Sequence, residues 1–215
     1  LSTNLSEIEL AVATMALGAG EALNPLQLLW INMVADIAPA MALALEPPEH
    51  DVLKQKPRDP NRPIIDGPDF KRLLRESAVI TGGSLAVYLL SRHRYGPGLN
   101  ASSNTFLAFT LAKFLHALSC RSEDTTVLDR DRPANPHMVY ALGGTLAIQA
   151  LATFYPPLRS LLRCSPLALV DVPLIVAGAS APFLINESVK RIGGGAEKSM
   201  LLDTGIAAET EQFGQ

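Results

Sequence analysis

Charged residues are scarce in this chain of 215 residues, because only 18% are Asp, Glu, Lys or Arg against about 25% in an average soluble protein. The deficit is local, since long apolar blocks alternate with short connectors that hold most of the charges. A soluble helical domain would instead carry charges along one face of every helix. The pattern is typical of a protein that crosses a membrane several times.

Cysteine and net positive charge are also scarce. Cys120 and Cys164 are the only cysteines, which excludes a disulfide framework and a zinc finger. A net charge of -3 disfavours a nucleic-acid partner. Neither a Met nor a charged leader precedes the first apolar stretch. We therefore expect residue 1 to lie within a longer protein, and not at the start of a signal peptide.

Six segments approach or reach the roughly 17 to 25 apolar residues that a helix needs to cross a bilayer. The sequence therefore predicts an all-α fold, a polytopic membrane bundle of about six transmembrane helices. These helices are expected near residues 1–18, 24–45, 71–91, 104–120, 137–155 and 166–187. Together they form one transmembrane domain at 1–192, with a connector at 46–70 and a flexible polar tail at 193–215.

The connectors differ in their content of basic residues. Thirteen Lys or Arg residues lie in the 46–75 connector, the 121–136 loop and the tail, whereas only four lie in the connectors between them. By the positive-inside rule, the basic connectors face the cytosol. Both ends of the chain are then cytosolic.

Three charged residues lie at one predicted depth. Glu7, Asp36 and Lys113 are eleven, twelve and nine residues from the predicted outer ends of their helices. With a rise of about 1.5 Å per residue, these positions are roughly 14 to 18 Å deep, near the middle of a hydrocarbon core about 30 Å thick. Ionisable groups at this depth are expensive and usually functional.

Amides accompany the two carboxylates. Asn4 and Glu7 are three residues apart, and Asn32 and Asp36 are four apart, so each pair shares one helix face. Carboxylate and amide oxygens are suited to Ca²⁺, Mg²⁺, Mn²⁺ or a monovalent cation. Pro39 cannot donate a helical hydrogen bond and would loosen the helix near Asp36. The alternative is that these polar residues only join helices by hydrogen bonds.

The stretch from Asn24 to Asp36 (NPLQLLWINMVAD), followed by Glu46-Pro-Pro-Glu49 and Pro57-Arg58, resembles the sixth transmembrane helix and following loop of P2-type ATPases, the family of the sarco/endoplasmic reticulum calcium pumps. Asn4 and Glu7 match the Asn-x-x-Glu of that family's fifth helix. The resemblance extends to about residue 192 and weakens after residue 90.

This resemblance implies that the chain begins within the fifth helix, and that Asn4, Glu7, Asn32 and Asp36 are ligands of the transported cation, with Ca²⁺ favoured. It also implies that the loop after the sixth helix faces the cytosolic phosphorylation domain and couples that domain to the membrane. The loop residues concerned are Glu46, Pro47, Pro48, Pro57 and Arg58.

Two positions depart from the calcium-pump pattern. Ala35 replaces a Thr, and Lys113 replaces a Glu of the eighth helix if Ala117-Leu118-Ser119 aligns with the family's Ala-Leu-Asn. We therefore expect one of two ion sites to be lost or altered, leaving at most one metal per cycle. The ammonium of Lys113 would pair with Glu7 or Asp36 as a built-in counter-ion. The alternative is a lysine whose stem reaches an interface.

Three motifs of the family do not occur in the sequence: the Asp-Lys-Thr-Gly-Thr phosphorylation motif, Gly-Asp-Gly-x-Asn-Asp and Thr-Gly-Glu. We expect the chain to be inactive alone, with ATP and Mg²⁺ used only by the complete pump. Its expected partners are the actuator, phosphorylation and nucleotide-binding domains, helices 1 to 4 and the lipid bilayer. The expected location is a bacterial plasma (inner) membrane.

Two alternatives to the function of a pump domain remain. One is a degenerate or regulatory fragment that does not pump. The other is an unrelated secondary carrier, which would share the midplane charges but not the patterns around Asn24 and Pro57.

Overall fold

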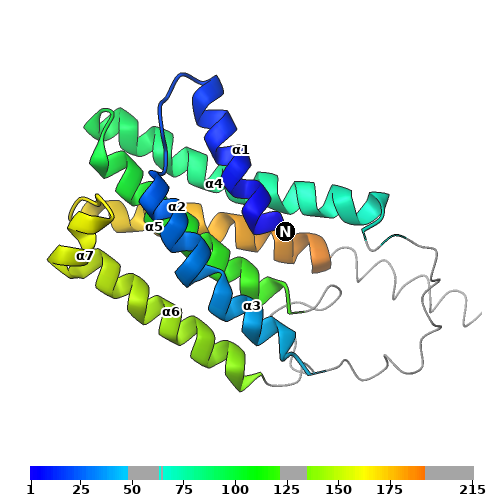
Figure 1. Ribbon diagram of the computed structural model, residues 1–215. Helices are drawn as coiled ribbons and strands as arrows, with labels where there is room; N and C mark the ends of the chain where they lie inside the picture. Colours follow the sequence, from blue (N-terminus) through cyan, green and yellow to red (C-terminus); the bar gives the residue numbers. More distant parts are fainter. Residues whose placement is uncertain (48–62, 64, 122–134, 192–215) are drawn as a thin grey trace, which may run out of the picture.

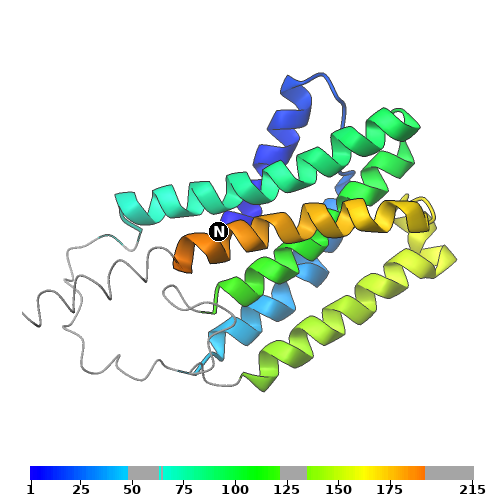
Figure 2. The ribbon, with the colours of Figure 1, turned by 180° about the vertical axis from the view of Figure 1, so that it is seen from behind.

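The computed structural model describes residues 1–47, 63, 65–121 and 135–191, and the regular structure in these residues is all helical (Figures 1 and 2). The predicted all-α fold is confirmed. In chain order the elements are α1 Ser2–Ala16, α2 Pro25–Trp30, the π-helical segment η1 Ile31–Ala35, α3 Ile37–Ala44, α4 Gly67–Tyr95, α5 Leu99–Ser119, α6 Pro136–Phe154 and α7 Pro156–Leu161. A last helix, Leu169–Arg191, opens with the 3₁₀ turn η3, Leu169–Asp171. The predicted tail and most of the 46–70 connector lie outside the described residues.

Four helices of the described chain are long and apolar enough to cross a membrane. They are Pro25–Ala44, which joins α2, η1 and α3, then α4, α6 and the last helix. The two remaining predicted spans, α1 and α5, do not have that length and hydropathy: α1 has 15 residues, and α5 has polar side chains at nine of its 21 positions.

The polarity of α5 follows from its place in the bundle. It lies between α4 and α6 in both views (Figures 1 and 2), and 14 of its 21 residues are buried. A helix surrounded by other helices does not need an apolar surface toward lipid. Hydroxyl groups of α5 bond to backbone carbonyls of the same helix, as in Thr110 to Phe106 at 2.8 Å. The interior position therefore explains how a helix of low hydropathy belongs to this bundle.

The turn between α1 and α2 contains two glycines with positive φ. Gly18 and Gly20 have φ of 60° and 83°, in the left-handed region that glycine adopts without strain. After the turn, the Asn24 side chain and Gln27 form a capping box, and Pro25 stands in the first turn of α2. This local chemistry fixes the start of the helix that carries Asn32 and Asp36.

Several helix boundaries differ from the prediction. α4 begins at Gly67, four residues before the predicted start, because Asp66 and Asp69 form a capping box there. α5 begins at Leu99 and not at residue 104. α7, Pro156–Leu161, lies between the predicted helices at 137–155 and 166–187, where no helix was expected. Two consecutive prolines suit the first turn of a helix, where no N–H is needed.

α4 and the last helix approach closely at two glycines. A Cβ atom at Gly83 would lie 2.5 Å from the carbonyl oxygen of Gly178, and one at Gly178 would lie 2.2 Å from a methyl group of Val87. Where α4 ends and the last helix begins, Asp171 accepts hydrogen bonds from the Tyr95 hydroxyl at 2.9 and 3.0 Å. Small residues allow this backbone approach, as in other membrane bundles. The contact sets the position of α4 relative to the last helix.

Candidate cation site

A π-helical segment interrupts the helix that carries Asn32 and Asp36. η1 spans Ile31–Ala35, and the N–H of Asp36 bonds to the Ile31 carbonyl at 3.1 Å. Short π segments occur often at functional sites. Pro39 is buried in α3, where its missing N–H removes the helical partner of the Ala35 carbonyl. The irregular backbone thus lies between Asn32 and Pro39.

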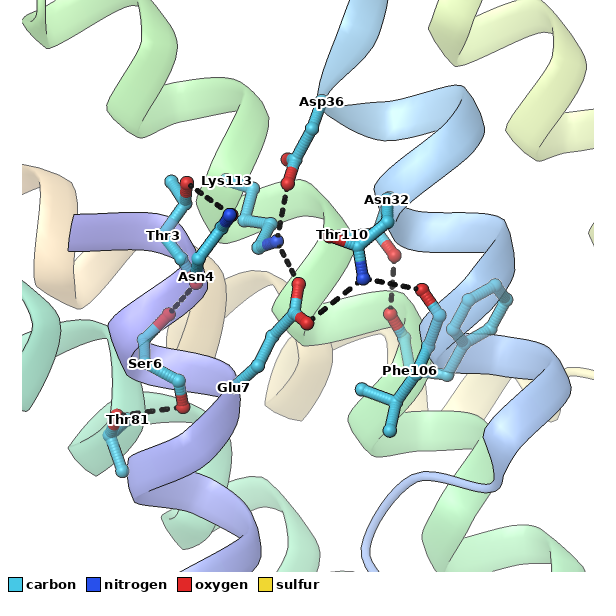
Figure 3. A network of polar contacts seen from close by, with 11 residues as sticks. Thr3, Asn4, Ser6, Glu7, Asn32, Asp36, Thr81, Phe106, Thr110 and Lys113 are labelled. Atoms are coloured by element: carbon cyan, nitrogen blue, oxygen red, sulfur yellow. Dashed lines mark hydrogen bonds and ion pairs between the residues drawn. The ribbon is translucent and has the colours of Figure 1, made fainter. Parts of the chain in front are cut away.

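Lys113 joins two carboxylates from two other helices (Figure 3). Its Nζ atom donates to Oδ2 of Asp36 at 2.9 Å and makes a short contact with Oε1 of Glu7. The lysine side chain is 1% exposed, against 13% for Glu7 and 22% for Asp36. The ammonium therefore lies inside the bundle and does not reach an interface. We call Glu7, Asp36 and Lys113 the charged triad.

The two predicted amide ligands lie differently. Asn32 donates from Nδ2 to Oε2 of Glu7 at 3.0 Å and to the Leu28 carbonyl at 2.9 Å, so it belongs to the same network (Figure 3). Asn4 is exposed and accepts a long bond of 3.4 Å from the Thr3 hydroxyl. Three of the four predicted ligands thus contact one another or Lys113, and Asn4 stands beside them.

Two cavities flank the charged triad. The larger, of about 360 Å³, lies among α1, η1, α3 and α5, and extends from Asn4, Asn32, Asp36 and Lys113 to Cys120 at the end of α5. The smaller, of about 210 Å³, lies between α1 and α2, and its lining includes Glu7 and Glu21. The contact between Lys113 and Glu7 therefore lies at the boundary of the two cavities.

The donor atoms of this region are mainly oxygens. Within the described part of the chain, no group of three or more His, Cys, Asp or Glu side chains is placed to share a metal. A cation here would be held by the carboxylates of Glu7 and Asp36 with amide oxygens, which are ligands for a hard cation. The two carboxylates and one ammonium leave a net charge of -1 in the charged triad.

The described start of the loop after α3 is attached to two other elements. Glu46 accepts hydrogen bonds from Nε of Arg121 at 2.9 Å and from Nδ2 of Asn135 at 2.5 Å. Asn135 also donates to the Ala42 carbonyl at 3.0 Å and caps α6. The end of α3 is therefore joined to α5 and α6. Pro47 lies within the described residues, whereas Pro48, Pro57 and Arg58 lie outside them.

Sequence reasoning assigned no partner to Glu9, whereas it expected His116 to form hydrogen bonds in the core. Glu9 accepts hydrogen bonds from two hydroxyl groups of α4, and Nε2 of His116 lies 2.8 Å from the Ser2 hydroxyl oxygen. The spacing of serine and threonine on α4 was the available signal, because positions 77, 81 and 84 share a helix face.

Comparison with known proteins places this arrangement in a family. The family model "Cation transporting ATPase, C-terminus" matches residues 20–192. The chain belongs to the cation-transporting P-type ATPases. It is 30% identical over 193 residues to calcium-transporting ATPase type 2C member 2 of mouse, covering 88% of this chain and 20% of that protein. It is 29% identical over 191 residues to a calcium-transporting ATPase of Bacillus subtilis, covering 88% and 21%. For calcium-transporting ATPase 1 of Saccharomyces cerevisiae the identity is 30% over 190 residues, covering 87% and 20%.

The chain corresponds to the C-terminal membrane region of these P-type ATPases. It spans about a fifth of the length of the curated relatives it matches. The family match and the four apolar helices indicate that the chain is a multi-pass membrane region of a cation-transporting ATPase. The resemblance to P2-type ATPases drawn from Asn24–Asp36 is thereby confirmed.

Proposed function

We propose that this chain is the membrane transport domain of an ATP-driven pump and that Glu7, Asn32 and Asp36 bind the transported cation, with Asn4 at the wall of the cavity. The observation that carries the proposal is the contact of Lys113 with two carboxylates from different helices, next to a polar cavity. An isolated carboxylate inside a membrane bundle is costly, so a cluster of this kind needs a functional reason.

Lys113 acts as a built-in counter-ion in this proposal. When no metal is bound, the ammonium neutralises part of the charge of Glu7 and Asp36, which avoids two unpaired buried carboxylates. When a metal enters, it must displace the ammonium from at least one carboxylate. The lysine thus competes with the metal and limits the site to at most one metal per cycle.

Ca²⁺ is the favoured cation, because the relatives named above are calcium-transporting ATPases and the ligands are hard oxygens. Mn²⁺, Mg²⁺ and monovalent cations satisfy the same ligand chemistry. Ala35 and Lys113 depart from the calcium-pump pattern, which has a Thr and a Glu at these positions. The transported ion is therefore to be determined by measurement.

The remaining parts of the pump would lie outside this chain. They are the actuator, phosphorylation and nucleotide-binding domains, where ATP and Mg²⁺ act, and helices 1 to 4. The share of about one fifth that the chain covers in its relatives supports this division. In the proposal the domain spans 1–192, the tail 193–215 is cytosolic, and the chain alone neither hydrolyses ATP nor pumps.

The proposed location is a bacterial plasma membrane, with both ends of the chain in the cytosol. The distribution of basic residues among the connectors supports this orientation. In the same proposal, the attachment of Glu46 to Arg121 and Asn135 helps transmit movement of the cytosolic domains to α3, which follows Asp36.

Ion-stimulated ATP hydrolysis by the complete pump tests this function. The parent, Asp36→Asn and Lys113→Glu are compared in Ca²⁺, Mn²⁺, Mg²⁺, Na⁺ and K⁺. We expect Asp36→Asn to abolish stimulation by the transported ion, and Lys113→Glu to change ion selectivity or stoichiometry. Glu187→Gln is the matched control, because it removes a carboxylate that does not line either cavity.

Unchanged ion stimulation in Asp36→Asn would refute the transport site and assign these residues a structural role. A parent protein that no ion stimulates would instead favour the second candidate, a degenerate or regulatory membrane fragment. The small share of the relatives that the chain covers is the observation behind that candidate.

A further inference from the structure

A second carboxylate of α1 lies away from the charged triad. Oε1 of Glu9 accepts a hydrogen bond of 2.7 Å from the Ser77 hydroxyl, and Oε2 accepts one of 2.9 Å from the Thr81 hydroxyl. Both hydroxyl groups belong to α4, and both residues are buried. Among the residues that the structure describes, no Lys, Arg or His pairs with Glu9.

This environment leaves the charge of Glu9 unbalanced. A carboxylate within a membrane bundle normally pairs with a positive group, and hydroxyl dipoles replace one only in part. Glu7 has Lys113 as such a partner, whereas Glu9 has only neutral donors. A small cation bound next to Glu9 would supply the missing charge.

The two hydroxyl groups can become cation ligands without movement of the helices. The Ser77 oxygen is also 3.0 Å from the Leu74 carbonyl, and the Thr81 oxygen is 3.2 Å from the Ser6 carbonyl (Figure 3). Each hydroxyl has one proton and two acceptors within reach. If both protons turn to the carbonyls, the hydroxyl lone pairs and the carboxylate of Glu9 offer four oxygen atoms to a cation.

A further oxygen lies on the same face of α4. Ser84 is fully buried, and its hydroxyl has no hydrogen-bond partner in the described part of the chain. Residues 77, 81 and 84 are spaced by four and three, so they share one face of the helix. Buried hydroxyl groups are nearly always bonded, so an unbonded one needs an explanation. A bound ion or water is a common one.

We propose that Glu9, Ser77 and Thr81 form a binding site for Na⁺ between α1 and α4, with Ser84 available as a further oxygen. All of these atoms are hard oxygen ligands. One carboxylate neutralises one positive charge, and Ca²⁺ usually takes six to eight oxygens, so the set favours a monovalent ion. The site shares no ligand with the charged triad and does not depend on the proposed pump cycle.

Equilibrium binding of radioactive Na⁺ to the full-length protein in detergent tests this site. Binding is measured without nucleotide, with Ca²⁺ chelated and with choline chloride at constant ionic strength. We expect one saturable site in the parent and an affinity lower by about tenfold or more in Glu9→Gln. Glutamine keeps the shape of Glu9 and one of its two acceptor oxygens, so the variant should fold.

Two variants of Thr81 form a matched pair that tests the hydroxyl group. Thr81→Val removes the hydroxyl at nearly constant shape and should weaken Na⁺ binding, whereas Thr81→Ser keeps the hydroxyl and should retain it. Gly82→Ala is the control on α4, because a Cβ atom there meets nothing within 4 Å.

Asp36→Asn separates this inference from the proposed function. We expect it to lose ion-stimulated ATP hydrolysis while keeping Na⁺ binding. The Na⁺ site is overturned if the parent binds no Na⁺ above the choline background. It is equally overturned if Glu9→Gln binds Na⁺ as the parent does, or if Asp36→Asn abolishes the binding and thereby assigns the ion to the charged triad.

Discussion

Glu7 and Glu9 are two carboxylates of one helix with opposite surroundings. Two residues turn an α-helix by about 200°, so Glu7 faces Lys113 of α5 and Glu9 faces Ser77 and Thr81 of α4. One charge has a lysine built into the fold, and the other has neutral hydroxyl groups. The comparison teaches that a membrane bundle can pair one buried carboxylate with its own lysine and surround another with neutral hydroxyl groups alone.

The largest expected effect on stability comes from removing the ammonium of Lys113, and it tests the difference between Glu7 and Glu9 directly. Lys113→Met keeps an unbranched stem of similar volume but leaves Glu7 and Asp36 without their ammonium. Loss of one partner of a buried ion pair typically costs about 3 to 5 kcal/mol. We expect a correspondingly lower thermal stability in detergent, whereas Glu9→Gln should cost far less, because Glu9 loses no charged partner.

A double variant tests the reason for that loss. Adding Glu7→Gln to Lys113→Met removes one of the two uncompensated charges and should restore part of the stability. If the double variant regains no stability, or if Glu9→Gln loses as much stability as Lys113→Met, then Glu7 and Glu9 do not differ in charge compensation as described.

The packing of α4 provides a smaller effect. Gly178→Ala would place a methyl group against Val87 and push α4 away from the last helix. Overpacking of this kind typically costs about 1 to 3 kcal/mol. We expect lower thermal stability for Gly178→Ala and little change for Gly143→Ala in α6, where a Cβ atom meets nothing within 4 Å. Equal stability of the two variants would contradict the close contact.

Because Ser77 and Thr81 are carried by α4, the same glycine variant extends the comparison of the two carboxylates. A shift of α4 should disturb Na⁺ binding at Glu9 more than ion-stimulated activity at Glu7. Na⁺ binding and ion-stimulated ATP hydrolysis are both measured in Gly178→Ala. Equal losses of the two would show that Glu7 and Glu9 depend on the same packing of α4.

The smallest expected effect concerns the two cysteines, which report which side of the membrane each end of the bundle faces. Cys120 lines the larger cavity, and Cys164 lies between α7 and the last helix. Burial raises the pKa of the Cys164 thiol, which accepts a hydrogen bond of 3.3 Å from the Gln27 amide. A raised pKa lowers the thiolate fraction at neutral pH, and the thiolate is the reactive form.

We therefore expect a membrane-impermeant maleimide to label Cys164 from outside the cell, slowly at pH 7 and faster as pH rises. Cys120 should be labelled only in inside-out vesicles. Single-cysteine variants give each rate separately. Labelling of Cys164 from the cytosolic side would reverse the proposed orientation.

Much of the site was predictable because it depends on composition and spacing. The depth of Glu7, Asp36 and Lys113 follows from counting residues along apolar segments, and the structure brings these three residues together. The role of α5 was harder to predict. Its low hydropathy weakens the signal of a membrane span, and only its interior position explains the polar residues. The α7 helix also escaped prediction, because paired prolines are compatible with a loop as well as a helix start.

The sequence by itself determined the class of the protein, its family and the residues that could bind a hard cation. These properties follow from local patterns: apolar length, residue spacing and the Asn24–Asp36 motif. The tertiary structure alone decided which charge meets which partner. Glu7 and Glu9 are almost identical in their local sequence context. Their difference arises only when the two faces of α1 pack against α5 and α4, since charge compensation depends on contacts between residues distant along the chain.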